Sequence, residues 1–176
     1  MILKDEFKKD YKAYLAILNS SLMWFFIENT GTELRGGYFR FNTKYIEPFP
    51  LPKLVNKEFF MGKADVMLDL NKQFQTKKQK FLKRMTDNFE LEKLSKKLEA
   101  FYELDFKTFL KELKKKKVTL TLIQQDEWEE YFESYQKELL EIKANIDTTD
   151  KEIDMMVYGL YGLSEDEVAL VEERGI

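Results

Sequence analysis

Apolar residues recur at alternating spacings of four and three positions in the second half of this 176-residue chain: Trp128, Phe132, Tyr135, Leu139, Ile142 and Ile146. This is the spacing of heptad positions a and d, which form one apolar stripe along a helix and need a second helix to cover it. Another helical stripe runs through residues 54–88, at Val55, Phe59, Met67, Leu70, Phe74, Phe81 and Met85. We expect the heptad stripe to pack against residues 64–85. The sequence thus predicts a mainly α fold, with long antiparallel helices forming a bundle or a coiled-coil-like pair.

Helix periodicity also predicts shorter helices on either side of residues 54–88. One helix is expected over residues 7–28, with Gly31 ending it in the left-handed conformation. Residues 89–102 and 105–113 are expected to form two shorter helices. Gly62 is the weak point of the long helix, because a glycine inside a helix costs about 1 kcal/mol relative to alanine.

The heptad helix is predicted to end near Asn145, and a helix capped at residues 148–150 is predicted to follow it. A capping box pairs a Ser or Thr with a Glu or Gln three positions later, so that each satisfies a free backbone N–H. The start and stop signals of this region are Thr121 with Gln124, Ser164 with Glu167, and Gly162.

Residues 31–53 are the least helical part of the chain. Gly36-Gly37 marks a turn, and aromatic and β-branched residues typical of short strands follow it: Tyr38, Phe39, Phe41, Thr43, Tyr45 and Ile46. Pro48, Pro50 and Pro52 then force an extended path. We predict a small β element near the N-terminus. Alternation along it would point Phe39 and Phe41 inward and Tyr38, Arg40 and Asn42 outward.

The chain contains no cysteine and no histidine. Their absence excludes a disulfide framework, a thiol nucleophile, a thiolate or imidazole metal site and a Ser-His-Asp triad. Two Glu-x-Lys tripeptides, at residues 112–114 and 141–143, lie inside helical patterns rather than on the adjacent strands of a nuclease centre. We therefore predict no catalytic residue, no metal ligand and no cofactor site in this chain.

Charge is distributed unevenly along the sequence. Residues 72–117 carry 15 basic and 7 acidic side chains, a net of +8, whereas residues 118–176 carry 4 basic and 16 acidic side chains, a net of −12. A basic block of this kind is typical of a surface that faces a polyanion. The alternative is that the acidic block packs against the basic block and neutralises it.

Two segments are candidates for contact with double-stranded DNA. In the first, basic side chains interleave with aromatic and amide side chains, which can contact phosphates and base edges: Arg35, Tyr38, Arg40, Asn42, Lys44 and Tyr45. Its structural alternative is a hairpin whose aromatic residues pack on the first helix. The second candidate, Lys114, Lys115, Lys116 and Lys117, is less specific, because solvated lysines of a loop have the same pattern.

The order of several phrases resembles the C-terminal region of a type IIG, TaqI-like restriction–modification enzyme. The phrases are LAILNS at Leu15–Ser20, PFPLP at Pro48–Pro52, VTLTLIQQDEWEEYF from Val118 and EIDMMVYGLYGLSEDEV from Glu152. The resemblance extends from about residue 13 to residue 171. Enzymes of this family fuse an adenine-specific DNA methyltransferase, often a nuclease, and a specificity domain.

The resemblance implies that residues 1–53 end a target-recognition domain and that residues 54–176 form a helical C-terminal region. The implied function is DNA target recognition, or scaffolding of it. S-adenosylmethionine and Mg²⁺ would then bind only to upstream methyltransferase and nuclease domains of the same polypeptide, because the Asn/Asp-Pro-Pro-Tyr/Phe motif of that methyltransferase does not occur here.

The alternative function is a non-catalytic helical module that joins or dimerises larger subunits through the seam of residues 128–146 without touching DNA. A homo-oligomer is compatible with either function. The most apolar run, residues 13–27, is shorter than the ~20 residues that a membrane-spanning helix needs. We therefore expect a cytoplasmic protein with no membrane partner.

Overall fold

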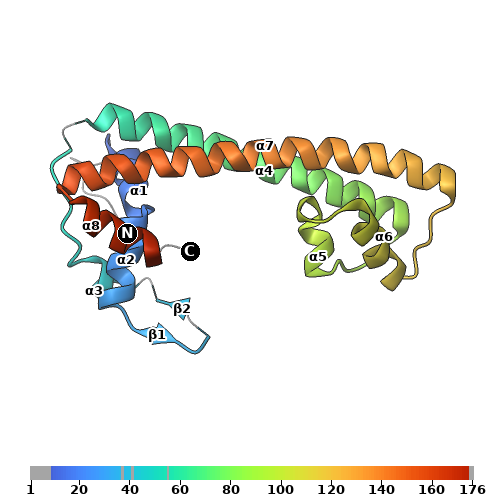
Figure 1. The fold of residues 1–176 in the computed structure, drawn as a ribbon, viewed down its shortest axis with the longest axis horizontal. Helices are drawn as coiled ribbons and strands as arrows, with labels where there is room; N and C mark the ends of the chain where they lie inside the picture. Colours follow the sequence, from blue (N-terminus) through green and yellow to red (C-terminus); the bar gives the residue numbers. More distant parts are fainter. Residues whose placement is uncertain (1–8, 37, 41, 55, 175–176) are drawn as a thin grey trace. The chain divides into compact units, whose positions relative to one another are not determined.

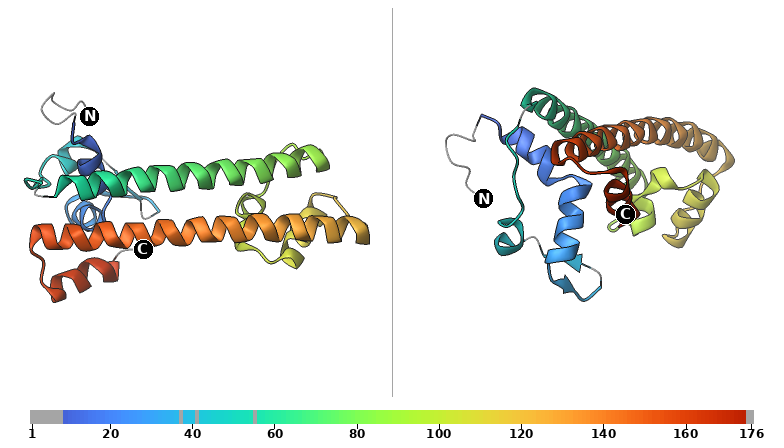
Figure 2. Two further views of the ribbon diagram at one scale, coloured as in Figure 1. Left: turned by 90° about the horizontal axis from the view of Figure 1, so that it is seen from above. Right: turned by 60° about the vertical axis from the view of Figure 1, so that its left-hand side comes forward.

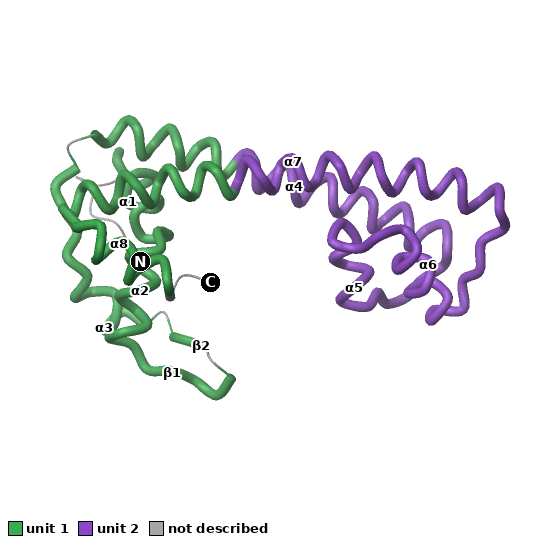
Figure 3. Tube along the Cα trace, in the orientation of Figure 1, with its two compact units in different colours: residues 1–68, 147–176 green, residues 69–146 purple. Residues whose placement is uncertain are grey.

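The computed structural model describes residues 9–36, 38–40, 42–54 and 56–174. The expected helix start at Phe7, the stripe residue Val55 and the inward-pointing Phe41 lie outside these residues. The chain forms two compact units, shown in Figure 3. Unit 1 combines residues 1–68 with 147–176, and unit 2 consists of residues 69–146. The domain boundary expected between residues 53 and 54 stays a prediction.

Unit 1 contains the short elements of both chain ends, as Figure 1 shows. Each of the two long helices, α4 and α7, contributes one end to unit 1 and the other to unit 2. In chain order the elements of unit 1 are α1 (Tyr11–Leu18), α2 (Ser21–Thr30), β1 (Glu33–Leu34), β2 (Tyr38–Phe39), α3 (Thr43–Ile46), the start of α4 (Lys57–Phe89), the end of α7 (Leu122–Tyr161) and α8 (Glu165–Arg174).

The single helix expected over residues 7–28 is wrong, because the helix is interrupted at Ser20, between α1 and α2. The Ser20 backbone is extended, and its hydroxyl accepts a hydrogen bond from the backbone N–H of Met23. The next residue, Ser21, donates from its backbone N–H and its hydroxyl to the Asp154 carboxylate, at 2.8 Å and 2.6 Å. A helix N-cap and a tertiary contact with α7 thus replace the continuous helix.

Two further expectations for this region are wrong. Gly31 ends α2 with an extended backbone (φ −81°, ψ 177°), not in the left-handed conformation. A glycine still fits there best, because a Cβ atom would lie 2.5 Å from the Ile27 carbonyl oxygen. Residues 43–46, expected as strand, form the helical turn α3, in which the Asn42 carbonyl accepts hydrogen bonds from the N–H groups of Tyr45 and Ile46.

The core of unit 1 lies where α1 and α2 meet the ends of α4 and α7. Its buried residues are Ala13, Ala16, Ile17, Met23, Ile27, Phe49, Phe60, Ala64, Ile153 and Val157. The ring of Phe49 contacts the ring of Phe26 edge-on at 5.2 Å between centroids. The hairpin and α3 are therefore tied to the helical core through the segment that follows them.

Unit 2 consists of the second half of α4, α5 (Lys96–Glu99), a 3-10 turn (Phe101–Glu103), α6 (Phe106–Lys115) and the first part of α7. The helix expected over residues 89–102 is wrong for residues 90–95 and 100, and its last two residues belong to the 3-10 turn. Glu90 leaves α4 with a positive φ of 50°, and the N–H of Leu91 bonds back to the Thr86 carbonyl. The helix expected at residues 105–113 is confirmed as α6, with Asp105 as its N-cap.

The packing of the heptad stripe against the long helix is confirmed. Figure 2 shows α4 and α7 running in opposite directions. Within unit 2, Phe132, Leu139 and Ile142 are buried, and Trp128, Tyr135 and Ile146 are half-buried. Phe81 of α4 stacks on Phe101 with 3.7 Å between ring centroids and meets the Phe132 ring at 6.2 Å. Aromatic side chains therefore fill most of this core.

The predicted helix break near Asn145 is wrong, since α7 is continuous over 40 residues. Thr149, expected as a cap, is buried on the same stripe as Ile153 and Val157, so the stripe continues through this region. The Ser164–Glu167 and Thr121–Gln124 capping boxes are both present. Gly162 closes α7 with a φ of +69°, as expected of a helix-ending glycine.

The α4–α7 contact gives a first prediction. Replacing Phe132 or Leu139 by alanine should lower the free energy of unfolding by about 2–5 kcal/mol, because each substitution leaves a cavity in a packed core. Chemical denaturation measures this change. Leu140→Ala is the control, since Leu140 is 44% exposed. If none of the three substitutions changed the denaturation midpoint, the packing of the stripe against α4 would be contradicted.

The interior of α4 gives a second prediction. Gly62 is exposed, and a Cβ atom added there would have no neighbour within 4 Å. Gly62→Ala should therefore raise the free energy of unfolding by about 0.5–1 kcal/mol through helix propensity alone. Gly162→Ala, at a positive φ, should instead lower it. Equal effects of the two substitutions in thermal unfolding would refute this interpretation.

Candidate nucleic-acid interface

The first candidate segment begins in a two-stranded hairpin. Strands β1 and β2 pair antiparallel, with Glu33 opposite Phe39 and Leu34 opposite Tyr38. Gly36 lies in the connecting turn with a φ of +97°, a conformation that favours glycine. Arg35 stands beside it and is exposed. The turn therefore presents a guanidinium at the tip of the hairpin.

The predicted alternation of side chains is confirmed for the described part of this segment. Tyr38 is 72% exposed, and Arg40 and Asn42 are exposed as well. Phe39 is half-buried, and its ring meets the Trp24 ring edge-on at 5.9 Å between centroids. One aromatic residue thus anchors the hairpin to α2, while its neighbours point to solvent.

Tyr45 and Lys44 on α3 are bound to their own surroundings. The Tyr45 hydroxyl forms a hydrogen bond with the Thr32 hydroxyl, and the Lys44 ammonium lies 4.5 Å from the centre of the Tyr45 ring. The Thr32 hydrogen bond and the nearby Lys44 lower the pKa of Tyr45 below its ordinary value. Tyr45 is half-buried and therefore braces the hairpin base, whereas Lys44 remains exposed.

This segment carries two guanidinium groups, those of Arg35 and Arg40. Within the described part of the chain, neither Arg35 nor Arg40 forms an ion pair with a carboxylate. Arg40 does help to lower the pKa of Tyr45 through its charge. Both side chains are exposed, and each guanidinium carries five N–H donors.

The second candidate segment is the lysine run at the end of α6. Lys114 and Lys115 lie in the last helical turn, and Lys116 is the C-cap. Lys117 follows with a φ of 65°, while the N–H groups of Lys117 and Val118 bond to the carbonyls of Lys114 and Leu113. This pair of bonds is a Schellman motif, in which the left-handed position is usually a glycine. Only two of the four lysines are therefore loop residues, and Lys117 adopts an uncommon conformation.

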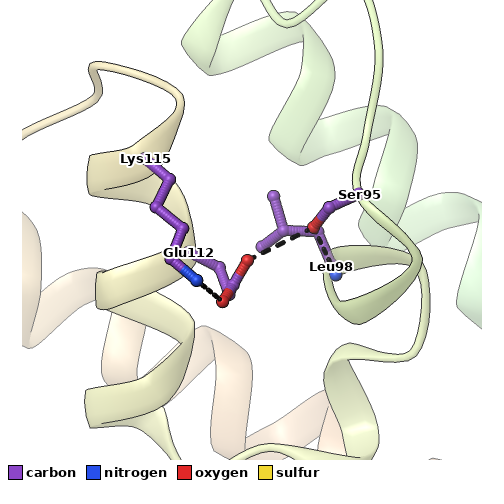
Figure 4. Close-up of polar contacts among 4 residues, drawn as sticks. All are labelled: Ser95, Leu98, Glu112 and Lys115. Atoms are coloured by element: carbon purple, nitrogen blue, oxygen red, sulfur yellow. Dashed lines mark hydrogen bonds and ion pairs between the residues drawn. The ribbon is translucent and has the colours of Figure 1, made fainter.

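Lys115 is already engaged within unit 2, as Figure 4 shows. Its ammonium forms an ion pair with the buried Glu112 at 2.6 Å. The Ser95 hydroxyl donates a 3.5 Å hydrogen bond to the other carboxylate oxygen and accepts one from the Leu98 N–H. Lys115 first, then the charge of Lys97 and the Ser95 hydrogen bond, hold the pKa of Glu112 below its ordinary value. The carboxylate therefore fastens α6 to the start of α5.

The candidate residues thus fall into two groups, one in each unit. The hairpin and α3 carry Arg35, Tyr38, Arg40, Asn42, Lys44 and Tyr45 in unit 1, and Lys114–Lys117 lie in unit 2. Sequence reasoning missed the Glu112 contact. The three-residue spacing of Glu112 and Lys115 on a helix was the available signal.

The described residues were compared with the requirements of a metal site and of a membrane-spanning helix. They contain no group of three or more acidic side chains placed to hold a metal ion. No helix in the described ranges is both long enough and apolar enough to cross a membrane.

Comparison with known proteins places most of the chain in one family. Residues 53–157 match the model of a domain of unknown function (DUF8810). The chain belongs to this family. The DUF8810 match includes the lysine run and all of unit 2 but not the hairpin. No curated protein and no solved structure matches the chain.

The Glu112 contact in the DUF8810 region gives a third prediction. A carboxyl group with a lowered folded-state pKa stabilises the fold above its ordinary pKa, and this stabilisation is lost as the pH falls through the folded pKa. Lys115→Gln should raise the pKa of Glu112, because a buried carboxylate loses its cation. An NMR pH titration of the parent chain and of the variant measures the pKa of Glu112 in each. Lys114→Gln is the control, and an unchanged pKa in Lys115→Gln would rule out the ion pair.

Proposed function

We propose that this chain takes part in DNA target recognition, or in scaffolding it, as the C-terminal part of a bacterial type II restriction–modification enzyme. The basic block docks on the phosphate backbone, and the hairpin approaches a groove. The phrase order that resembles type IIG enzymes supports the enzyme class, and the exposed cations of the two candidate segments support the role.

The observation that carries the proposal is that the basic block keeps its charge. In residues 72–117, all of them described, only Lys77 and Lys115 form ion pairs. Lys77 pairs with Glu138 of the acidic third, whereas Lys115 pairs with Glu112 of its own helix. The other cations of the block remain available to phosphates, whose neutralisation releases counterions and favours binding. Internal neutralisation by the acidic block is therefore the weaker interpretation.

The conformation of Lys117 supports the same role. A residue with a side chain at a left-handed position costs roughly 1–2 kcal/mol relative to an ordinary helical conformation, and glycine avoids this strain. The Schellman motif after α6 nevertheless holds a lysine. We infer that the positive charge at this position serves binding rather than stability.

The hairpin supplies the groups suited to direct readout. Guanidinium groups can form two hydrogen bonds with guanine, and amide side chains can do the same with adenine. Arg35, Arg40 and Asn42 are exposed with their polar groups in solvent. Phe39 packs the hairpin against α2, and Tyr45 bonds to Thr32 at the base of the hairpin. In this proposal both residues support the hairpin and do not contact DNA.

In this proposal the chain contributes no chemistry of its own. The parent protein would be a restriction endonuclease and a site-specific adenine methyltransferase, with its S-adenosylmethionine and Mg²⁺ bound by other domains of the polypeptide. The partners of this region would be double-stranded DNA and those domains, in the cytoplasm.

The proposal gives a fourth prediction, tested by the affinity for duplex DNA over a series of salt concentrations. Replacing Lys114, Lys116 and Lys117 by glutamine should lower the slope of log affinity against log salt by about one unit per lost phosphate contact. Arg35→Ala and Arg40→Ala should each weaken binding to the recognised site by about 1–3 kcal/mol if they contact bases.

Lys143→Gln is the matched control, because Lys143 is an exposed lysine of the acidic third. It should leave the affinity and the slope nearly unchanged. If the parent chain and all these variants give one common curve, the recognition proposal fails.

A second candidate function is a helical interaction module without DNA contact. An apolar groove of about 430 Å³ in unit 1 favours it, lined by Phe59, Thr148, Lys151, Glu152, Met155 and Met156. Met155 is 65% exposed, and methionine adapts readily to different partner surfaces. The seam of residues 128–146 cannot serve this purpose, since α4 covers it.

A further inference from the structure

A cleft of about 530 Å³ lies along one face of α4 in unit 2, the purple unit of Figure 3. The lining residues from α4 recur at the spacing of a single helix face. They are Lys78, Gln79, Leu82, Lys83 and Thr86, and the segment after α4 adds Leu94 and Glu99. The cleft is therefore formed by α4 and the chain that turns back along it.

The lining combines an apolar floor with an excess of positive charge. Leu82 is buried and Leu94 half-buried, whereas Lys83 is exposed. The lining includes two lysines, Lys78 and Lys83, and one carboxylate residue, Glu99. Among the residues that the structure describes, neither Lys78 nor Lys83 forms an ion pair. The cleft is thus suited to an anion that also carries an apolar or planar group.

Lys78 is oriented by an uncharged aromatic ring. Its ammonium lies 5.5 Å from the centre of the Tyr102 ring, and the Tyr102 ring is held edge-on against Phe74 at 5.2 Å. The face of an aromatic ring attracts a cation but carries no net charge. Lys78 is therefore fixed at the cleft while its full charge remains available to a ligand.

From this arrangement we propose that the cleft binds a nucleotide. The phosphate oxygens accept hydrogen bonds from Lys78 and Lys83, and the base lies on Leu82 and Leu94. Glu99 accepts hydrogen bonds from the ribose hydroxyls, a role that carboxylates fill in many nucleotide sites. The volume is within the range of about 300–1,000 Å³ that is usual for small-ligand pockets.

The nucleotide can be free or can belong to a nucleic-acid strand, because both offer the same phosphate, sugar and base. Binding of a free nucleotide does not depend on the proposed binding of duplex DNA, so the nucleotide proposal and the DNA proposal can fail separately. A chain without salt-dependent affinity for duplex DNA that still binds a free nucleotide would refute only the DNA proposal.

The test is calorimetric titration of the chain with ADP, inorganic pyrophosphate and adenosine. ADP should bind more tightly than either of the other two. Lys78→Gln and Lys83→Gln should each weaken ADP binding about tenfold, because each removes a charge-assisted hydrogen bond. Lys80→Gln is the matched control: Lys80 is an exposed lysine of the same helix that does not line the cleft. It should change the affinity less than about twofold.

Three results would overturn the proposal: no saturable binding of ADP, pyrophosphate binding as tight as that of ADP, or an equal loss in Lys80→Gln. The first excludes a site, the second excludes a role for the apolar floor, and the third indicates diffuse attraction by the helix. Thermal unfolding of each variant checks that the fold is unchanged. Competition by a single-stranded oligodeoxynucleotide for bound ADP would assign the site to a nucleic-acid strand, and its absence to a free nucleotide.

Discussion

The mutual burial of the apolar stripes of α4 and α7 is the contact on which both units depend. Each helix is apolar on one face only, and a single helix cannot cover its own stripe. Each stripe is therefore shielded from water only by a partner helix. In unit 1, Phe60 of α4 and Ile153 of α7 share a core, and in unit 2 Phe81 of α4 and Phe132 of α7 share another. The smaller elements are then added to this pair: α1 and α2 complete the first core, and α5 and α6 complete the second. The exposed faces of the pair are free to differ in charge.

Much of this arrangement could be predicted, because its causes are local in the sequence. Heptad spacing predicted the buried stripe of α7, and the capping boxes at Thr121 and Ser164 depend on residues three positions apart. The errors have causes that are distant. Ser20 breaks the first helix while the adjacent Ser21 bonds to Asp154, 133 residues further along the chain. Thr149 resembles a cap in sequence, but its position on the buried stripe keeps α7 continuous.

The candidate site was predictable to a similar degree. Alternation along the hairpin predicted which of Tyr38, Phe39 and Arg40 would face solvent, since a two-residue period needs no tertiary information. The run of four lysines did not predict which of them already has a partner within the fold. Lys115 lies three positions after Glu112 on the same helix, but the burial of Glu112 depends on the packing of α6 against the start of α5, and the strain at Lys117 depends on where the helix ends. Composition predicts the charge of such a segment but not which charges are already used.

The placement of charge along the paired helices accounts for how basic and acidic blocks coexist in one small chain. Were the blocks folded against each other, many ion pairs would connect them, yet the described residues show one, Lys77 with Glu138. The apolar stripes already hold α4 and α7 together, so the fold does not require those pairs. Exposed ion pairs contribute only about 0–1 kcal/mol each. Little stability is therefore lost where lysines of α4 have no ion pair among the described residues, as at Lys72, Lys78, Lys80 and Lys83. A surface of free cations on a stable helix is the consequence, and it is the property that a polyanionic partner or a phosphate-bearing ligand can use.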